Sequence, residues 1–269
     1  MSFRYVEIER KGHVGWLWLN RPDKKNALAA EKWTEIPRAL ERLASDPETR
    51  VVVVAARGSA FTVGIDLEML MSMQPEGPSD AIRRMAMYRK IRELQATMSA
   101  FEECPVPVIA AVHGWCIGAG IDLITACDLR LASADAVFSV RETKIAIVAD
   151  VGTLQRLPKV ISRGHAAELA YTGRDIDAAE AERIGLINHW YPDVDTLHAA
   201  AQSLGEEIAA NSPFVVQGVK AVLRAEEGMA TAAALDHVAL WNSAFLQTND
   251  LGEAMAAYVE RRPPEFTGT

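Results

Sequence analysis

The chain has 269 residues, 49% of them hydrophobic and 24% charged, as in an ordinary soluble globular protein. With 28 basic and 36 acidic residues, its formal net charge of −8 excludes a general attraction for nucleic acid or anionic membranes. Three cysteines without a CxxC pair argue against a disulfide framework or a cysteine-rich zinc site. We expect reduced thiols, no secretory signal, no membrane span and a cytoplasmic location.

Predicted strands and helices alternate along the first two thirds of the chain. Continuous or alternating apolar runs predict strands, and apolar residues three or four apart predict helices. In chain order these are strands at 3–9 and 14–20, a helix at 28–44, a strand at 50–55, a helix at 80–102, a strand at 105–112, a helix ending near Cys127, and strands at 128–132, 137–140 and 186–190. Pro37 lies inside the first helical pattern and is expected to kink or split it.

Beyond residue 192 the pattern becomes helical throughout. The order predicts an α/β core at residues 1–192, followed by a helical region at 193–269. The alanine-rich helices between about 194 and 260 carry apolar stripes on more than one side. Such stripes fit packing against another subunit as well as packing on the core of the same chain.

Two glycine-containing turns follow buried strands. They are Phe61–Leu67 and Ile117–Asp122. Each turn would expose backbone N–H groups at the start of a helix, where a negative charge is favoured. Together they could direct two donors at one oxygen, which is the geometry of an oxyanion hole. A phosphate cradle fits less well, since Leu123 occupies the third glycine position of GxGxxG. The alternative for a lone Gly-x-Gly is a purely structural turn.

Three carboxylates lie among apolar residues in the same part of the chain. Asp122, Glu142 and Asp150 each have a structural alternative: a charge at a helix N-terminus, an ion pair with Arg141 or Lys144, and a helix N-cap, respectively. Apolar surroundings would instead raise a carboxyl pKa and suit it to proton transfer near neutral pH.

Other catalytic arrangements are missing from the sequence. There is no GxSxG motif, and the six histidines show no HExxH or other metal-binding spacing. We therefore predict no metal site. His113 adjoins a buried strand and is expected to be a hydrogen-bonded core residue rather than a base.

Three segments together resemble the enoyl-CoA hydratase/isomerase (crotonase) superfamily. Residues 19–28 resemble its first CoA-contacting loop, and residues 60–67 and 105–122 resemble its two oxyanion segments. Residues 149–160 most resemble the Δ3,5-Δ2,4-dienoyl-CoA isomerases. The resemblance implies an α/β fold, a spiral of ββα units with a C-terminal helical trimerisation region, and trimers that pair as hexamers.

The resemblance also implies the site. Glu142, Asp150 and Asp122 would be catalytic, and the backbone N–H groups of Ile65 and Ala119 would form the oxyanion hole. Hydratases usually carry glutamate at the positions of Asp122 and Glu142 and glycine at that of Asp150, so this set favours an isomerase. The family usually has glycine where this chain has Ala119, whose N–H remains. The residues expected to contact the substrate are Asn26, Ala27, Leu28, Val63, Gly64, Asp66, Leu67, Gly118 and Gly120.

The implied reaction shifts 3,5-dienoyl-CoA to 2,4-dienoyl-CoA. We place Glu142 at C2 and Asp150 at C6, with Asp122 in a supporting role, although the sequence does not fix that direction. The expected partner is an acyl-CoA thioester, with no nucleic acid, no membrane and no separate cofactor, because CoA is part of the substrate. Alternatives are a 2-enoyl-CoA hydratase and, in another class, a non-catalytic CoA-pocket scaffold or RNA-binding protein.

Overall fold

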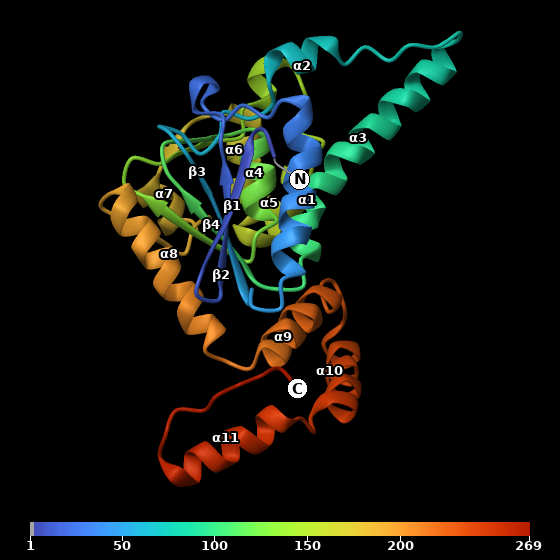
Figure 1. The fold of residues 1–269 in the computed structure, drawn as a ribbon. Coiled ribbons are helices and arrows are strands. Elements are labelled where there is room, and N and C mark those ends of the chain that lie inside the picture. Colours follow the sequence, from blue (N-terminus) through green and yellow to red (C-terminus); the bar gives the residue numbers. More distant parts are fainter. Residues whose placement is uncertain (1–2) are drawn as a thin grey trace.

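A six-stranded sheet forms the centre of the fold in this computed structural model, which describes residues 3–269 (Figure 1). Residues 1 and 2 of the predicted core lie outside the described part. The strand order is β1-β2-β3-β4-β6-β9, and neighbours are parallel except for the β1–β2 hairpin. The strands are β1 (Val6–Lys11), β2 (Val14–Leu19), β3 (Val51–Ala56), β4 (Val108–Val112), β6 (Leu129–Ser133) and β9 (His189–Tyr191).

A smaller sheet lies beside the larger one. Its order is β5 (Trp115–Ile117), β7 (Val137–Ser139) and β8 (Ile176–Asp177). The chain leaves β4 for β5 and then enters helix α4 (Ala119–Thr125), and it leaves β6 for β7 and then passes to α5 (Thr153–Val160). This repeated strand–strand–helix path confirms the predicted α/β spiral. The sequence missed β5 and β8 because each has only two or three residues.

Helices cover both faces of the large sheet. On β3, Val52 and Val54 belong to the cluster beneath α1 and α3, whereas Val51 and Val53 belong to the cluster beneath α8. Burial on both faces explains why this strand reads as one continuous apolar run. The helices before the C-terminal lobe are α1 (Ala30–Ala44), α2 (Leu67–Ser72), α3 (Asp80–Glu103), α6 (Arg163–Thr172), α7 (Ala178–Arg183) and α8 (Val194–Ala209), together with the short 3₁₀ turns η1 (Pro22–Lys24) and η2 (Glu142–Ile145).

Pro37 does not split α1, which runs unbroken from Ala30 to Ala44. A proline inside a helix leaves the carbonyl four residues earlier without its N–H partner. Here that carbonyl belongs to Trp33, and the hydroxyl of Thr97 on α3 donates to it at 2.7 Å. The neighbouring helix thus satisfies the group that the proline leaves free.

The last three helices form a lobe below the sheet (Figure 1). They are α9 (Pro213–Ala225), α10 (Thr231–Phe245) and α11 (Asn249–Glu260). By contrast, α8 packs on the sheet through Leu197 and Ala201. The predicted boundary at 192/193 remains a prediction. No helix within residues 3–269 is long and apolar enough to cross a membrane.

Candidate active site

The two glycine-containing turns meet at the junction of the sheets. Thr62 pairs with β5, donating its N–H to Trp115 at 2.8 Å and accepting from the Ile117 N–H at 3.1 Å. At Gly64, φ is +86°, and an added Cβ would lie 2.8 Å from the Ile117 carbonyl oxygen and 3.4 Å from the Ala119 nitrogen. Only glycine fits this approach. The first turn therefore lies directly against the start of α4.

Two backbone N–H groups at this junction are unpaired. Within residues 3–269, neither the Ile65 N–H nor the Ala119 N–H has a hydrogen-bond acceptor. Ala119 is the first residue of α4, where an N–H has no partner inside the helix. Both residues line the same two adjoining cavities. The arrangement can present two donors to one ligand oxygen.

The two cavities differ in character. The outer cavity, about 600 Å³, has Lys24, Lys25 and Arg141 among its lining residues. The inner cavity, about 280 Å³, is mainly apolar but also contains the three carboxylates. The residues common to both are Ile65, Ala119, Glu142 and Ile145. An elongated ligand with an anionic head and an apolar tail would therefore pass the two free N–H groups.

The predicted substrate-contact residues divide into two groups. The outer cavity is lined by Ala27, Val63, Gly64, Asp66, Leu67 and Gly118. Asn26, Leu28 and Gly120 do not line it. Asn26 and Leu28 are fully buried, and Gly120 packs against Thr62, whose Cγ2 would lie 2.8 Å from an added Cβ. These three support the cavity wall from behind.

Glu142 lies at the boundary between the two cavities. Its Oε1 is 3.3 Å from the position that a Cβ on Gly118 would take. Its Oε2 is buried without a hydrogen-bond partner in the described chain. The structural alternative was an ion pair with Arg141 or Lys144. Arg141 pairs with Asp175 instead, and Glu142 has no ion pair with Lys144 in the described chain. Burial, reinforced by the charge of Asp122, raises the pKa of Glu142 to about 7.

Asp122 is held in place by a hydrogen bond from the start of α5. Its side chain is almost fully buried, and its Oδ1 accepts the N–H of Thr153, the first residue of α5. Asp122 thus accepts the N–H at the start of α5. In the structural alternative considered for Asp150, Asp150 would have capped this helix. Burial raises the pKa of Asp122 to about 6, although the Thr153 hydrogen bond and the nearby Arg156 act in the opposite direction.

Asp150 also lines the inner cavity. The residue at the N-cap of α5 is Gly152, and the backbone carbonyl of Asp150 accepts from Gln95 Nε2 on α3 at 2.6 Å. Its carboxylate forms no ion pair with any residue of the described chain and lines the cavity with Asp122 and Glu142. Burial raises its pKa too. Three carboxyls with raised pKa values in one apolar cavity favour proton transfer.

No histidine of the described chain lines either cavity. His113 is buried beside the Gly58 carbonyl, with Nε2 at 2.9 Å, as expected of a core residue. Among residues 3–269, no group of three or more His, Cys, Asp or Glu side chains is arranged so that it could hold a metal ion.

Sequence reasoning missed one buried charge behind the site. Lys32 on α1 is fully buried. Its spacing was the available signal, since positions 28, 32, 36 and 40 share one helix face and the other three residues there are apolar.

Comparisons with known proteins agree with the fold and motifs. A family model described as enoyl-CoA hydratase/isomerase matches residues 9–269. The chain is 42% identical over 271 residues to the peroxisomal Delta(3,5)-Delta(2,4)-dienoyl-CoA isomerase of Arabidopsis thaliana, with 98% of each chain covered. It is 42% identical to the human mitochondrial protein of that name, with 97% of this chain and 80% of that protein covered. An enoyl-CoA hydratase structure from Bacillus anthracis matches with a TM-score of 0.89 at 31% identity, covering 99% of this chain and all of that one.

The expected cytoplasmic location is contradicted by these relatives. The plant protein is named as peroxisomal, and the human and Dictyostelium discoideum proteins as mitochondrial. The expectation depended partly on the three thiols, which are buried and free. Reduced thiols persist in any reducing compartment, so they could not distinguish the cytoplasm from the interior of an organelle.

Proposed function

The chain belongs to the enoyl-CoA hydratase/isomerase family, and we propose that it is an acyl-CoA isomerase converting 3,5-dienoyl-CoA to 2,4-dienoyl-CoA. The observation that carries this proposal is the pair of carboxyls in the inner cavity, Glu142 and Asp150, with Asp122 beneath them. Relatives at about 42% identity that are named dienoyl-CoA isomerases support it.

The chemistry follows from the order of groups along the two cavities. The CoA portion would occupy the outer cavity, with its thioester oxygen between the N–H groups of Ile65 and Ala119. Loss of a proton from C2 places negative charge on that oxygen, and the conjugated chain carries charge to C6. A proton added at C6 leaves double bonds at C2 and C4. The thioester accepts the charge during the reaction, so the route requires no metal or redox cofactor.

The positions of the two carboxyls indicate which carbon each serves. Glu142 lines both cavities together with Ile65 and Ala119, whereas Asp150 lines only the inner cavity. C2 is next to the thioester carbon, and C6 lies four carbons further along the chain. We therefore propose Glu142 as the base at C2 and Asp150 as the acid at C6, the direction expected from the sequence. Burial raises the pKa of both carboxyls, that of Glu142 to about 7.

This direction predicts how the rate depends on pH. Because Glu142 must be ionised to take the proton from C2, kcat/KM should rise about tenfold per pH unit below about pH 7. Initial rates between pH 5 and pH 9 test this. A rate that instead falls as the pH rises through 7 would assign Glu142 as the protonated acid.

Ultraviolet absorbance tests the function itself. Incubation with 3,5-octadienoyl-CoA should produce the absorption band of a conjugated 2,4-dienoyl thioester, while a parallel sample with 2-enoyl-CoA should change slowly or not at all. Loss of only the 2-enoyl band would identify a hydratase. No change in either sample would favour the non-catalytic alternative, for which the net charge of −8 makes RNA a poor partner.

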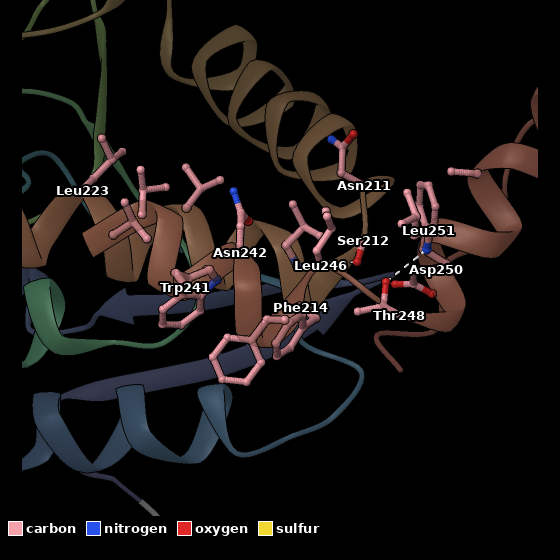
Figure 2. A pocket seen from close by; sticks show the side chains of 18 residues that line it. Asn211, Ser212, Phe214, Leu223, Trp241, Asn242, Leu246, Thr248, Asp250 and Leu251 are labelled. Atoms are coloured by element: carbon pink, nitrogen blue, oxygen red, sulfur yellow. Dashed lines mark hydrogen bonds between the residues drawn. The ribbon is translucent and has the colours of Figure 1, made fainter. Parts of the chain in front are cut away.

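We also propose that the C-terminal lobe assembles with further copies of the chain, as a trimer or a pair of trimers. No residue of α10 is buried, and even its leucines Leu235 and Leu240 are 63% and 69% exposed. A cavity of about 480 Å³ between α9, α10 and α11 is lined by mostly apolar side chains, including Phe214 and Trp241 (Figure 2). Exposed apolar surface of this extent marks an association site.

A charge placed on this lobe should prevent assembly. Leu240→Asp would bury an unpaired carboxylate in the proposed interface, at a cost of several kcal/mol. We expect light scattering after size-exclusion chromatography to show a trimer or hexamer for the wild type and smaller species for the variant. Asp236→Asn, on the same helix, serves as the control. A monomeric wild type would contradict the proposal.

A further inference from the structure

Lys32 is a fully buried lysine, and both of its hydrogen bonds go to one residue. Its Nζ donates to the backbone oxygen of Asn26 at 3.2 Å and to the Asn26 Oδ1 at 3.3 Å. Lys220, the other buried lysine, differs in having an ion pair with Asp128 at 2.7 Å. Lys32 has no ion pair with any residue between 3 and 269.

The electrostatic cost of burying Lys32 is substantial. Burial, and then the charge of Arg21, lowers the pKa of Lys32 to about 7, while Asp23 and Glu35 act weakly in the opposite direction. An ammonium buried without a carboxylate partner destabilises a fold unless its hydrogen bonds compensate. The role of Lys32 should therefore lie in its two hydrogen bonds to Asn26.

Asn26 is the junction of the loop that forms the cavity wall. It has a left-handed backbone, with φ of +57°, and follows Lys25, with φ of +47°. Its amide donates to the carbonyls of Arg57 at 2.8 Å and Ala60 at 2.9 Å. Its Oδ1 also accepts the N–H of Arg21 at 2.7 Å. Lys32 therefore stabilises a residue that links three segments.

The contacts continue from Asn26 to the oxyanion segment. The hydroxyl of Thr62 donates to the Asn26 backbone oxygen at 2.8 Å and accepts the N–H of Gly64 at 3.1 Å. The Gly64 carbonyl accepts the N–H of Leu28 at 2.8 Å. The peptide fixed in this way is the one that carries the N–H of Ile65.

We propose that Lys32 is a positioning residue that holds the Ile65 N–H in place through Asn26 and Thr62. The proposal depends on the proposed function in one respect, the use of that N–H by the thioester oxygen. Removing a complete oxyanion donor costs about 10²- to 10³-fold in rate. Displacing one by a fraction of an ångström should cost about tenfold. The loss should fall on kcat, because the enolate needs the donor more than the ground-state carbonyl does.

Steady-state kinetics separates positioning from general stability. Lys32→Met keeps the buried volume but removes the charge and the donors, and Lys220→Met is the matched control away from both cavities. At a temperature where both variants are folded, Lys32→Met should lower kcat for 3,5-octadienoyl-CoA about tenfold with KM within about twofold. Lys220→Met should lower the melting temperature but not kcat. Equal kcat for Lys32→Met and the wild type would overturn the proposal.

A second measurement does not require isomerase activity. Octanoyl-CoA with ¹³C at the thioester carbonyl cannot isomerise, and a donor on its oxygen lowers the infrared stretching frequency of that carbonyl. We expect a smaller shift on binding to Lys32→Met than to the wild type or to Lys220→Met. Lys32→Gln, which retains a donor, replaces Lys32→Met if the latter does not fold, and should give an intermediate shift. The same shift in all proteins would refute the role of Lys32, whatever the outcome of the isomerase assay.

Discussion

Replacing Asp150 with asparagine is expected to abolish dienoyl isomerisation while leaving substrate binding intact. Asparagine keeps the size and polarity of the side chain but cannot deliver a proton to C6. Proton transfer by a positioned group contributes about 10²- to 10⁴-fold, and a loss at the upper end is expected where no other acid is available. The fold should tolerate the change, because Asp150 anchors to α3 through its backbone carbonyl and not through its carboxylate.

The assay follows the 2,4-dienoyl band, and calorimetric titration with octanoyl-CoA checks binding. Asp80→Asn, at the exposed start of α3, is the control and should be unaffected. Near-normal turnover by Asp150→Asn would remove Asp150 from the mechanism. If hydration were the true activity, Asp122→Asn should impair it at least as much as Asp150→Asn.

Glu142→Gln should be inactive in isomerisation and yet more stable than the wild type at pH 8. The amide cannot take a proton from C2, so a loss of about 10²- to 10⁴-fold is expected. The stability gain arises because the folded chain raises the pKa of Glu142 to about 7, above its ordinary value of 4.5. Above pH 7 the wild type therefore holds a carboxylate that burial disfavours, whereas the amide is neutral.

The stability gain of Glu142→Gln over the wild type depends on pH. The folded state binds this proton more tightly than the unfolded state does, so the contribution of Glu142 to stability falls as the pH rises from about 4.5 to about 7. The difference in melting temperature between Glu142→Gln and the wild type should therefore be largest above pH 7 and should shrink toward pH 4.5. An active variant would remove Glu142 from the mechanism, and a variant less stable than the wild type at pH 8 would contradict the burial penalty on its carboxylate.

Local patterns predicted most of the fold because the elements with long apolar runs are also those that the sheet buries. The run at 50–55 became β3, covered on both faces. Pro37 does not split its helix as the sequence allowed, because the rule for a helix-breaking residue considers only its own helix. The Trp33 carbonyl that the proline leaves free accepts from Thr97, 64 residues away in the sequence.

The carboxylates show the same limit at the site. Asp122 lies in the first turn of α4 and Asp150 lies just before α5, so local rules favoured Asp150 as the residue that satisfies the start of α5. The structure gives that contact to Asp122, which is 31 residues from Thr153 in sequence. Lys32 was missed for a related reason, since a lysine is ordinarily exposed and only its spacing with apolar neighbours marked it as buried.

The two cavities allow the enzyme to fix the reacting bonds with one set of residues and to select the acyl chain length with another. Ile65 and Ala119 stand where the cavities join, so the distance to each carbon is measured from the thioester end of any substrate. Met87, Ile91 and Leu94 of α3 line the inner cavity and not the outer one. Smaller or larger side chains there could change which acyl lengths fit without altering where the double bonds move. Evolution could thus adjust the range of fatty acyl substrates through one helix while the chemistry stays fixed.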